Sequence, residues 1–167
     1  MSRKEITPRE LTLNPFTAIG DDWMLITAGN EKSFNTMTAS WGGMGILWNK
    51  PVVFCFLRPQ RYTLEFVEAN DLFTLSIFNH DIYKKELSYC GSRSGRDVDK
   101  VKETGLTPLF PDGTVAFDEA HTVLTVRKLY KQDFDPACFI DSSLETNYPQ
   151  KDYHRMFIGE IVKAYTK

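Results

Sequence analysis

Short segments rich in β-branched and aromatic residues recur along the chain, and Gly, Pro, Asn or Asp bounds most of them. Residues 23–28, 52–57 and 72–78 have the length and composition that are typical of strands. Residues 121–129 and 155–165 resemble strands that are covered on both faces for part of their length and exposed elsewhere. This spacing predicts a mainly β protein.

Three segments between these strands have the apolar spacing of short helices. In the first, residues 63–69, the hydroxyl of Thr63 is in a position to cap the helix. The second, residues 81–89, is expected to end before Gly91. The third, residues 97–104, is followed by a glycine, which is typical of a helix C-terminus.

Several closely spaced strands with few strong helices favour a closed or nearly closed β-barrel over a doubly wound parallel sheet. No internal repeat or low-complexity linker divides the sequence. Residues 1–167 are therefore expected to form a single domain. The 12 Phe, 7 Tyr and 3 Trp favour strands and a flat, aromatic ligand pocket.

The charge and cysteine content exclude several classes of function. Twenty basic and 22 acidic residues give a net charge of -2, which argues against nucleic-acid partners and anionic membranes. No segment has the roughly 20 apolar residues of a membrane-spanning helix. Three widely spaced cysteines, without a secretory signal at the N-terminus, predict neither a disulfide framework nor zinc, and indicate a cytoplasmic protein.

The segment from Asn35 to Gly45 combines alternating hydroxyls, an indole and several glycines. Hydroxyls and amides can satisfy the polar edge of a planar ligand, and Trp41 can cover its face. Small residues would allow the backbone to approach closely. The alternative is an edge strand with hydroxyls that face water, followed by a glycine loop.

The segment from Arg58 to Thr63 places two guanidinium groups before a predicted helix. Helix N-termini attract anions, and Arg adds charge-assisted hydrogen bonds, so we interpret this segment as a phosphate site. A capping loop whose arginines pair with surface carboxylates is the alternative. Residues 91–100 form a second basic segment, in which Ser94 and Asp97 have a spacing like that of a capping box. This loop could close over a phosphate or simply be solvated.

No residue is predicted to be catalytic, and no metal site is expected. The three histidines do not form a metal-binding motif, and neither a P-loop nor a complete dinucleotide fingerprint is present. His154 could approach a ligand from the start of the last strand or be an ordinary polar residue there. Cys90 could be reactive, although a free cysteine usually behaves as a small buried apolar residue.

The ordered set of segments 35–43, 58–63 and 91–100 resembles the flavin reductase-like, FMN-binding split-barrel family, and its flavoredoxin branch in particular. The resemblance runs from about Asn14 to Val162 and includes residues 71–77 and 154–162. It implies an antiparallel split β-barrel of Greek-key-like topology with short peripheral helices. It also implies a homodimer that binds FMN near the subunit interface.

The resemblance further implies a set of cofactor-binding residues. Those expected around the ring system and ribityl chain are Thr36, Met37, Thr38, Ala39, Ser40 and Trp41. Those expected at the phosphate are Arg58, Arg61, Tyr62, Thr63, Ser92, Arg93, Ser94 and Lys100.

The implied activity is that of an NAD(P)H-dependent flavin oxidoreductase that passes electrons through bound FMN to free flavin, iron or a protein acceptor. Two alternatives remain at this point. One is a non-enzymatic electron carrier that exchanges electrons only with a redox partner protein, and the other is a flavin-binding regulatory module without turnover.

Overall fold

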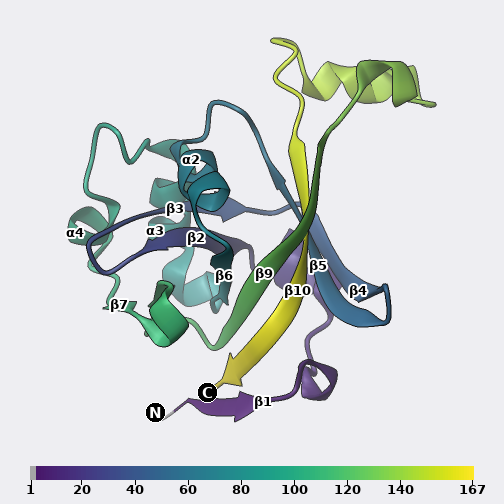
Figure 1. Cartoon of the computed structure of the whole chain (residues 1–167). Helices are drawn as coiled ribbons and strands as arrows, with labels where there is room; N and C mark the ends of the chain where they lie inside the picture. Colours follow the sequence, from purple (N-terminus) through teal and green to yellow (C-terminus); the bar gives the residue numbers. More distant parts are fainter. Residues whose placement is uncertain (1–2) are drawn as a thin grey trace.

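One curved antiparallel sheet dominates the structure, a computed structural model that describes residues 3–167 (Figure 1). Seven of its strands follow the order β3-β2-β6-β9-β10-β5-β4, and β1 pairs with β10. The strands are β1 (Lys4–Ile6), β2 (Met24–Asn30), β3 (Ser33–Ala39), β4 (Gly42–Leu47), β5 (Lys50–Leu57), β6 (Leu72–Ile77), β9 (Thr122–Asp133) and β10 (Arg155–Thr166). A separate pair, β7 (Pro108–Leu109) and β8 (Ala116–Phe117), forms a small second sheet.

The two end strands of this path, β3 and β4, are consecutive in the chain. Only Ser40 and Trp41 lie between them. The sheet curls around one apolar core but β3 does not pair with β4, so the barrel is open along this line. The mainly β, antiparallel prediction is confirmed, and all five strands expected from the sequence are present.

The sheet packs apolar residues on both of its faces because successive side chains of a strand point in opposite directions. In β2, Ile26 and Ala28 face the barrel core, whereas Leu25 packs in a second cluster with Leu87 and Phe117. This second cluster fills the space between the sheet and the helices outside it. Strand β9 was expected to be covered on both faces for only part of its length. Its first five residues are buried, and most of the others are exposed, which agrees with that expectation.

The helices are short and peripheral (Figure 1). They are α1 (Pro15–Gly20), α2 (Tyr62–Ala69), α3 (His80–Ser92) and α4 (Lys100–Thr104), with 3-10 turns η1 (Pro8–Glu10), η2 (Pro111–Gly113), η3 (Pro136–Cys138) and η4 (Ser142–Asn147). Helices α1 and α2 contribute side chains to the barrel core, whereas α3 and α4 pack in the second cluster. None of the helices formed by residues 3–167 has the length and apolar character that a membrane crossing requires.

Two predictions about the ends of the first two expected helices are wrong. The N-cap of α2 is Arg61 rather than Thr63, whose hydroxyl instead accepts a hydrogen bond from Asn35. Helix α3 does not stop before Gly91, because the glycine is accommodated inside the last turn. Tertiary contacts can override a weak local preference of this kind.

Helix α4 begins at Lys100, later than expected, and Asp99 caps it by accepting hydrogen bonds from two backbone amides. The predicted relation between Ser94 and Asp97 is therefore not a capping box. Ser94 instead closes a local turn, since its hydroxyl accepts from the amide of Arg96 at 3.2 Å. The expected glycine ends the helix, with Gly105 at a φ of 72°.

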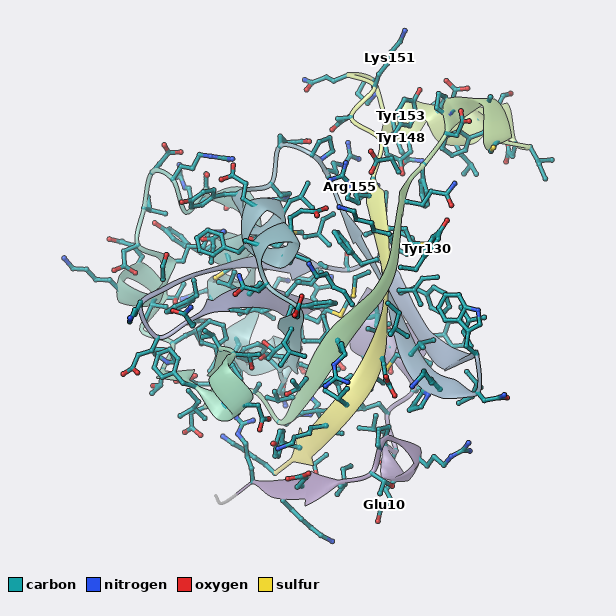
Figure 2. The ribbon with its side chains drawn as sticks, viewed as in Figure 1. Glu10, Tyr130, Tyr148, Lys151, Tyr153 and Arg155 are labelled. Atoms are coloured by element: carbon teal, nitrogen blue, oxygen red, sulfur yellow. The ribbon has the colours of Figure 1, made fainter. Side chains whose placement is uncertain are left out.

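A long excursion separates β9 from β10, and we call residues 134–154 the arm. Figure 1 shows the arm projecting beyond one end of the barrel. It contains η3 and η4, and its base is an aromatic cluster in which the rings of Tyr148 and Tyr153 lie 5.0 Å apart (Figure 2). The arm returns to the barrel beside β5, where it forms part of the site described next.

Candidate flavin-binding site

Two adjoining hollows lie on the surface formed by β3, β5, α2, the end of α3 and the arm. The basic hollow has a volume of about 430 Å³ and is lined by Asn35, Met37, Arg58, Gln60, Arg61, Tyr62, Thr63, Ser92, Arg93, Ser94, Gly95 and Lys100. The aromatic hollow has a volume of about 180 Å³ and is lined by Met37, Thr38, Ala39, Ser40, Trp41, Phe56, Arg58, Arg61 and His154. Three of these residues belong to both walls, so the hollows form one groove.

The N-terminus of α2 opens into the basic hollow. Its N-cap, Arg61, makes no capping hydrogen bond with its side chain. Within residues 3–167, the amides of Tyr62 and Thr63 have no backbone acceptor. Free amides and the helix dipole make such an end favourable for an anion.

Several cations around the basic hollow lack an acidic partner. The Arg61 guanidinium donates from Nη1 to the carbonyl of Gly91 at 2.5 Å. Burial lowers the pKa of Arg61, and repulsion from Arg58 lowers it further. Across residues 3–167, neither Arg61, Arg93 nor Lys100 forms an ion pair. The hollow therefore carries uncompensated positive charge.

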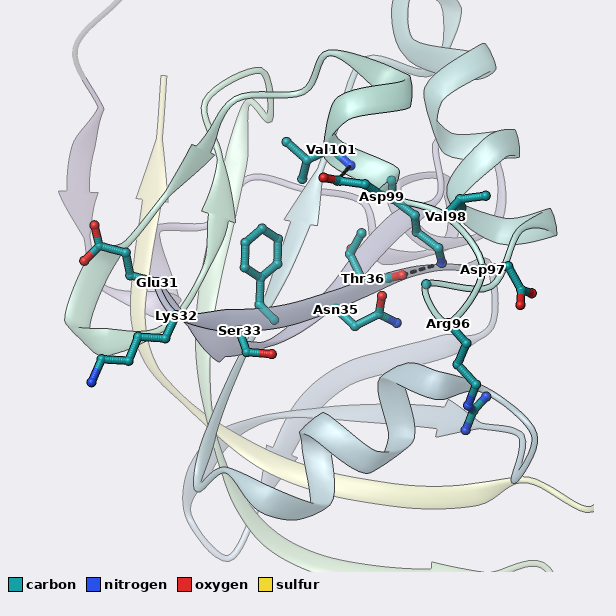
Figure 3. A pocket seen from close by; sticks show the side chains of 13 residues that line it. Glu31, Lys32, Ser33, Asn35, Thr36, Arg96, Asp97, Val98, Asp99 and Val101 are labelled. Atoms are coloured by element: carbon teal, nitrogen blue, oxygen red, sulfur yellow. Dashed lines mark hydrogen bonds between the residues drawn. The ribbon is translucent and has the colours of Figure 1, made fainter.

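Lys100 is a buried cation in the wall of the basic hollow. Its Nζ donates to the carbonyl of Thr36 at 2.6 Å and to that of Cys90 at 2.8 Å, and Figure 3 shows the first of these bonds. Burial lowers the pKa of Lys100 to about 8, and the Arg61 charge acts in the same direction. An ammonium has three donors, so one remains for a ligand.

Asn35 connects two walls of the basic hollow, although the sequence analysis did not include it among the cofactor-binding residues. Its amide donates to the hydroxyl of Thr63 at 2.8 Å and so connects β3 to the first turn of α2. A Cβ on Gly95 would lie 1.9 Å from the Asn35 amide oxygen. Residues 92–95 can approach this closely because position 95 is glycine, and a side chain there would force the Asn35 amide to move.

The aromatic hollow lies where the barrel is open between β3 and β4. Trp41 forms one wall with about half of its surface exposed, and its ring lies 5.4 Å from that of His154. Met37 and Phe56 add apolar surface. A flat ring system fits between such walls because aromatic faces and thioethers both make favourable stacking contacts.

The arm partly compensates the charge of Arg58, one of the three residues that line both hollows. Asp152 accepts from its Nη1 at 2.6 Å, and the Asn147 carbonyl accepts from Nη2 at 2.8 Å. The guanidinium also lies 5.1 Å from the centre of the Tyr148 ring. Hydrogen bonds from Arg58 and Gln60 lower the pKa of Asp152. Arg58 is thus partly compensated, unlike Arg61.

A third hollow of about 460 Å³ lies on the other side of Asn35 and Gly95 (Figure 3). It is somewhat larger than the basic hollow, but its charges are mixed. Glu31, Asp97 and Asp99 line it together with Lys32, Arg96 and Lys100. Without an excess of one charge, this hollow is a poorer anion site than the groove.

Comparison with known proteins agrees with this arrangement. Residues 17–167 match a protein-family model described as a flavin reductase like domain. The chain belongs to the flavin reductase-like family. No curated protein matches it at a significant level.

Solved structures of other flavin reductase-like and FMN-binding proteins share the fold. A flavoredoxin from Methanosarcina acetivorans is 23% identical, with a TM-score of 0.68 over 87% of this chain and 68% of that one. An FMN-binding domain of a flavin reductases-like enzyme from Shewanella baltica is 17% identical, with a TM-score of 0.70 over 99% and 77%. A Shewanella frigidimarina protein described as having a split barrel domain is 20% identical, with a TM-score of 0.67 over 96% and 77%. The fold is therefore the split barrel.

Most of the residues expected to hold the cofactor of this flavin reductase-like chain come together in the groove. Those at the basic hollow are Arg58, Arg61, Tyr62, Thr63, Ser92, Arg93, Ser94 and Lys100, and those at the aromatic hollow are Met37, Thr38, Ala39, Ser40 and Trp41. Their contact with a flavin stays a prediction.

Two of the hydroxyls expected at the cofactor already form hydrogen bonds within the protein. The Thr36 side chain is buried and bonds the Thr27 hydroxyl at 2.8 Å, so only its carbonyl reaches the site, through Lys100. The Thr38 hydroxyl donates to the carbonyl of Leu87 at 2.5 Å. Both belong to a strand whose side chains alternate between groove and packing contacts.

Sequence reasoning did not include Asn35, Gln60, Gly95 or Phe56 among the residues of the groove. Of these, Gly95 carried a signal, because a glycine within a basic segment is compatible with close approach to another residue. Cys90, by contrast, is a fully buried thiol whose pKa burial raises to about 11. A thiol with these properties is not a reactive nucleophile.

Proposed function

We propose that the chain binds FMN along the groove and acts as an oxidoreductase, taking electrons from NAD(P)H and passing them to an acceptor. The observation that carries this proposal is the continuity of the two hollows. A cationic cradle at a helix N-terminus adjoins an aromatic slot through the shared residues Met37, Arg58 and Arg61. A phosphate attached to a flat ring system requires both environments.

The donor set of the basic hollow fits a phosphate. Arg61, Arg93 and Lys100 supply positive charge, Ser92 and Ser94 supply hydroxyls, and the first turn of α2 supplies free amides. Charge-assisted hydrogen bonds of this kind are short and strong. The positively charged side chains would also favour a ligand whose negative charge increases on reduction.

The aromatic hollow fits a planar ring. When bound, the flavin would supply the chemistry of hydride acceptance and electron transfer, which no side chain can perform. The chain's own contribution is to hold the ring between Met37, Trp41 and Phe56 and to keep one side accessible. The exposed position of Trp41 supports access for a nicotinamide ring from the solvent.

The electron donor and the electron acceptor are proposed from the names of structural neighbours. One structural neighbour, from Streptomyces globisporus, is named an NADH:FAD oxidoreductase, which supports NAD(P)H as the donor. Other neighbours, from Methanosarcina acetivorans and Desulfovibrio vulgaris, are named flavoredoxins, which supports the second candidate, a non-enzymatic carrier that serves a partner protein. Free flavin, iron or a redox protein would accept the electrons.

We also propose that the chain works as a homodimer. The free edge strand β4 and its flanks carry three exposed apolar residues, Trp41, Ile46 and Trp48. Unpaired edges with exposed apolar side chains are favourable places for a second copy to pack. Because Trp41 also lines the aromatic hollow, such a partner would adjoin the flavin site.

The absorption spectrum of the purified protein tests the central proposal. Bound flavin should give a yellow protein, and denaturation should release FMN rather than FAD. Anaerobic addition of NADH or NADPH should then bleach the flavin absorption if the protein is a reductase. Bleaching only by a reduced partner protein would favour the carrier. A protein that neither contains FMN nor binds it at micromolar concentration would refute both.

A further inference from the structure

The arm contributes a hydrogen bond whose orientation determines what the aromatic hollow can bind. Tyr148 and His154 are both buried, and the Tyr148 hydroxyl lies 2.8 Å from Nδ1 of His154. His154 lines the aromatic hollow, whereas Tyr148 lies behind it. The two residues are six positions apart at the base of the arm.

Packing holds the Tyr148 ring in place from several sides. Tyr153 lies 5.0 Å away and Phe139 lies 5.9 Å away, measured between ring centres. The Arg58 guanidinium, itself fixed by Asp152, lies 5.1 Å from the same ring. The phenol oxygen is therefore a fixed point against which the imidazole is oriented.

The partners available to the two groups determine which of them donates the hydrogen in the Tyr148–His154 bond. Within residues 3–167, the Tyr148 hydroxyl has no partner other than His154. If Nδ1 carried the proton, the phenol hydrogen would have no acceptor, and an unmade bond at a buried donor is costly. If the phenol donates to Nδ1, both groups are satisfied. The second ring nitrogen, Nε2, then carries the hydrogen.

The charges around His154 keep the ring in this form. Burial lowers the pKa of His154 to about 4, and the positive charges of Arg58 and Arg61 act in the same direction. Asp152 opposes them, but its carboxylate is already bonded to Arg58 and Gln60. Burial also raises the pKa of Tyr148, so the phenol keeps its proton.

We propose that Tyr148 is a positioning residue, which holds the His154 imidazole so that Nε2–H can donate to a carbonyl oxygen of the ligand in the aromatic hollow. The inference rests on the proposed function for the identity of that ligand. A flavin ring and a nicotinamide carboxamide both offer a carbonyl oxygen. Thr38 already donates to a protein carbonyl. Ser40, Trp41 and Arg61 also line this hollow and carry donors, so Nε2–H of His154 would act beside them.

A matched pair of variants separates the role of the hydroxyl from that of the aromatic ring. Tyr148→Phe removes the hydrogen bond to Nδ1 and keeps the ring. Tyr153→Phe makes the same chemical change in the adjacent ring, which has no hydrogen bond to His154. Two-bond ¹H–¹⁵N spectra of the full-length, histidine-labelled protein at pH 7 report the tautomer directly, with His154→Gln to assign the signal.

The expected spectrum of the wild type and of Tyr153→Phe shows an unprotonated Nδ1 and a protonated Nε2 on His154. Tyr148→Phe should show a mixture of tautomers. It should also weaken ligand binding by the inverse of the fraction that keeps Nε2 protonated, about twofold for an even mixture. A loss in FMN affinity assigns the carbonyl to the flavin. A rise in the NADH KM at unchanged FMN affinity assigns it to the nicotinamide.

The wild-type spectrum alone can overturn the inference, even if Tyr148→Phe fails to fold. A proton on Nδ1, or a charged ring at pH 7, would contradict it, as would identical behaviour of the two phenylalanine variants. These results would leave the proposed function standing if the wild type binds FMN. Conversely, a wild type that does not bind FMN would refute the proposed function whatever the tautomer of His154.

Discussion

Arg61→Ala should weaken FMN binding without a comparable loss of stability. Arg61 occupies the N-cap position of α2, lines both hollows and has no acidic partner among residues 3–167. A charge-assisted bond to phosphate is worth roughly 1.5 to 3 kcal/mol. We therefore expect the dissociation constant of FMN to rise roughly ten- to a hundredfold.

The flavin-free protein should lose little stability in this variant. The guanidinium's bond to the Gly91 carbonyl is lost, which is unfavourable. However, the same substitution removes a buried cation and its repulsion from Arg58, the two effects that lower the pKa of Arg61. These changes oppose each other, so the melting temperature of the flavin-free protein should stay within a few degrees of the wild-type value.

Titration with FMN and with riboflavin makes the test specific for the phosphate. Riboflavin has the same ring system without the phosphate, so its affinity should be nearly unchanged in Arg61→Ala. The matched control is Arg96→Ala, which removes an arginine of the nearby 91–100 segment that pairs with Glu65 and lines neither hollow of the groove, although it lies over the Tyr62 ring. Equal losses for FMN and riboflavin, or an equal effect of both substitutions, would refute the phosphate assignment.

Three further predictions concern other parts of the site. Because the pKa of Lys100 lies near 8, Lys100 should lose its charge and FMN affinity should fall as the pH rises above 8. Lys100→Gln should flatten this pH dependence. An equally steep fall in riboflavin affinity would contradict the prediction. FMN should quench tryptophan emission in the flavin-free protein, and Trp41→Phe should remove more quenching than Trp23→Phe or Trp48→Phe, which replace residues outside the groove. Light scattering should give about twice the chain mass of 19.2 kDa for the flavin-loaded protein, and a monomer mass would refute the homodimer.

The strands were predictable because their signal is local. In β2, β5 and β6, a run of β-branched and aromatic residues ends at a turn residue, and nothing else in the chain competes for the same segment. The helix ends were less predictable. Thr63 is a favourable N-cap by residue type, but its hydroxyl instead accepts a hydrogen bond from the amide of Asn35, 28 positions earlier. No local pattern contains that contact.

The groove was predictable in outline for a different reason. The segments around Trp41, Arg61 and Arg93 each contain residue types that suit one part of a phosphorylated planar ligand, and the fold brings them to one surface. The roles within the segments were not predictable. Alternation along β3 turns the Thr36 hydroxyl toward Thr27 and leaves Met37 in the groove, a difference that depends on strand register.

The arm reduces the positive charge where the two hollows meet, and this effect could not be inferred from composition. From sequence, Arg58 and Arg61 are equivalent cations three residues apart. In the fold, Asp152 pairs with Arg58 across 94 positions and leaves Arg61 without an acidic partner among residues 3–167. The unpaired charge then comes from Arg61, which lines both hollows, and from Arg93 and Lys100, which line only the basic hollow. A ligand with one anionic end and one aromatic end is consequently favoured with its anion in the basic hollow, and the arm adds to this effect by pairing Arg58 where the two hollows meet.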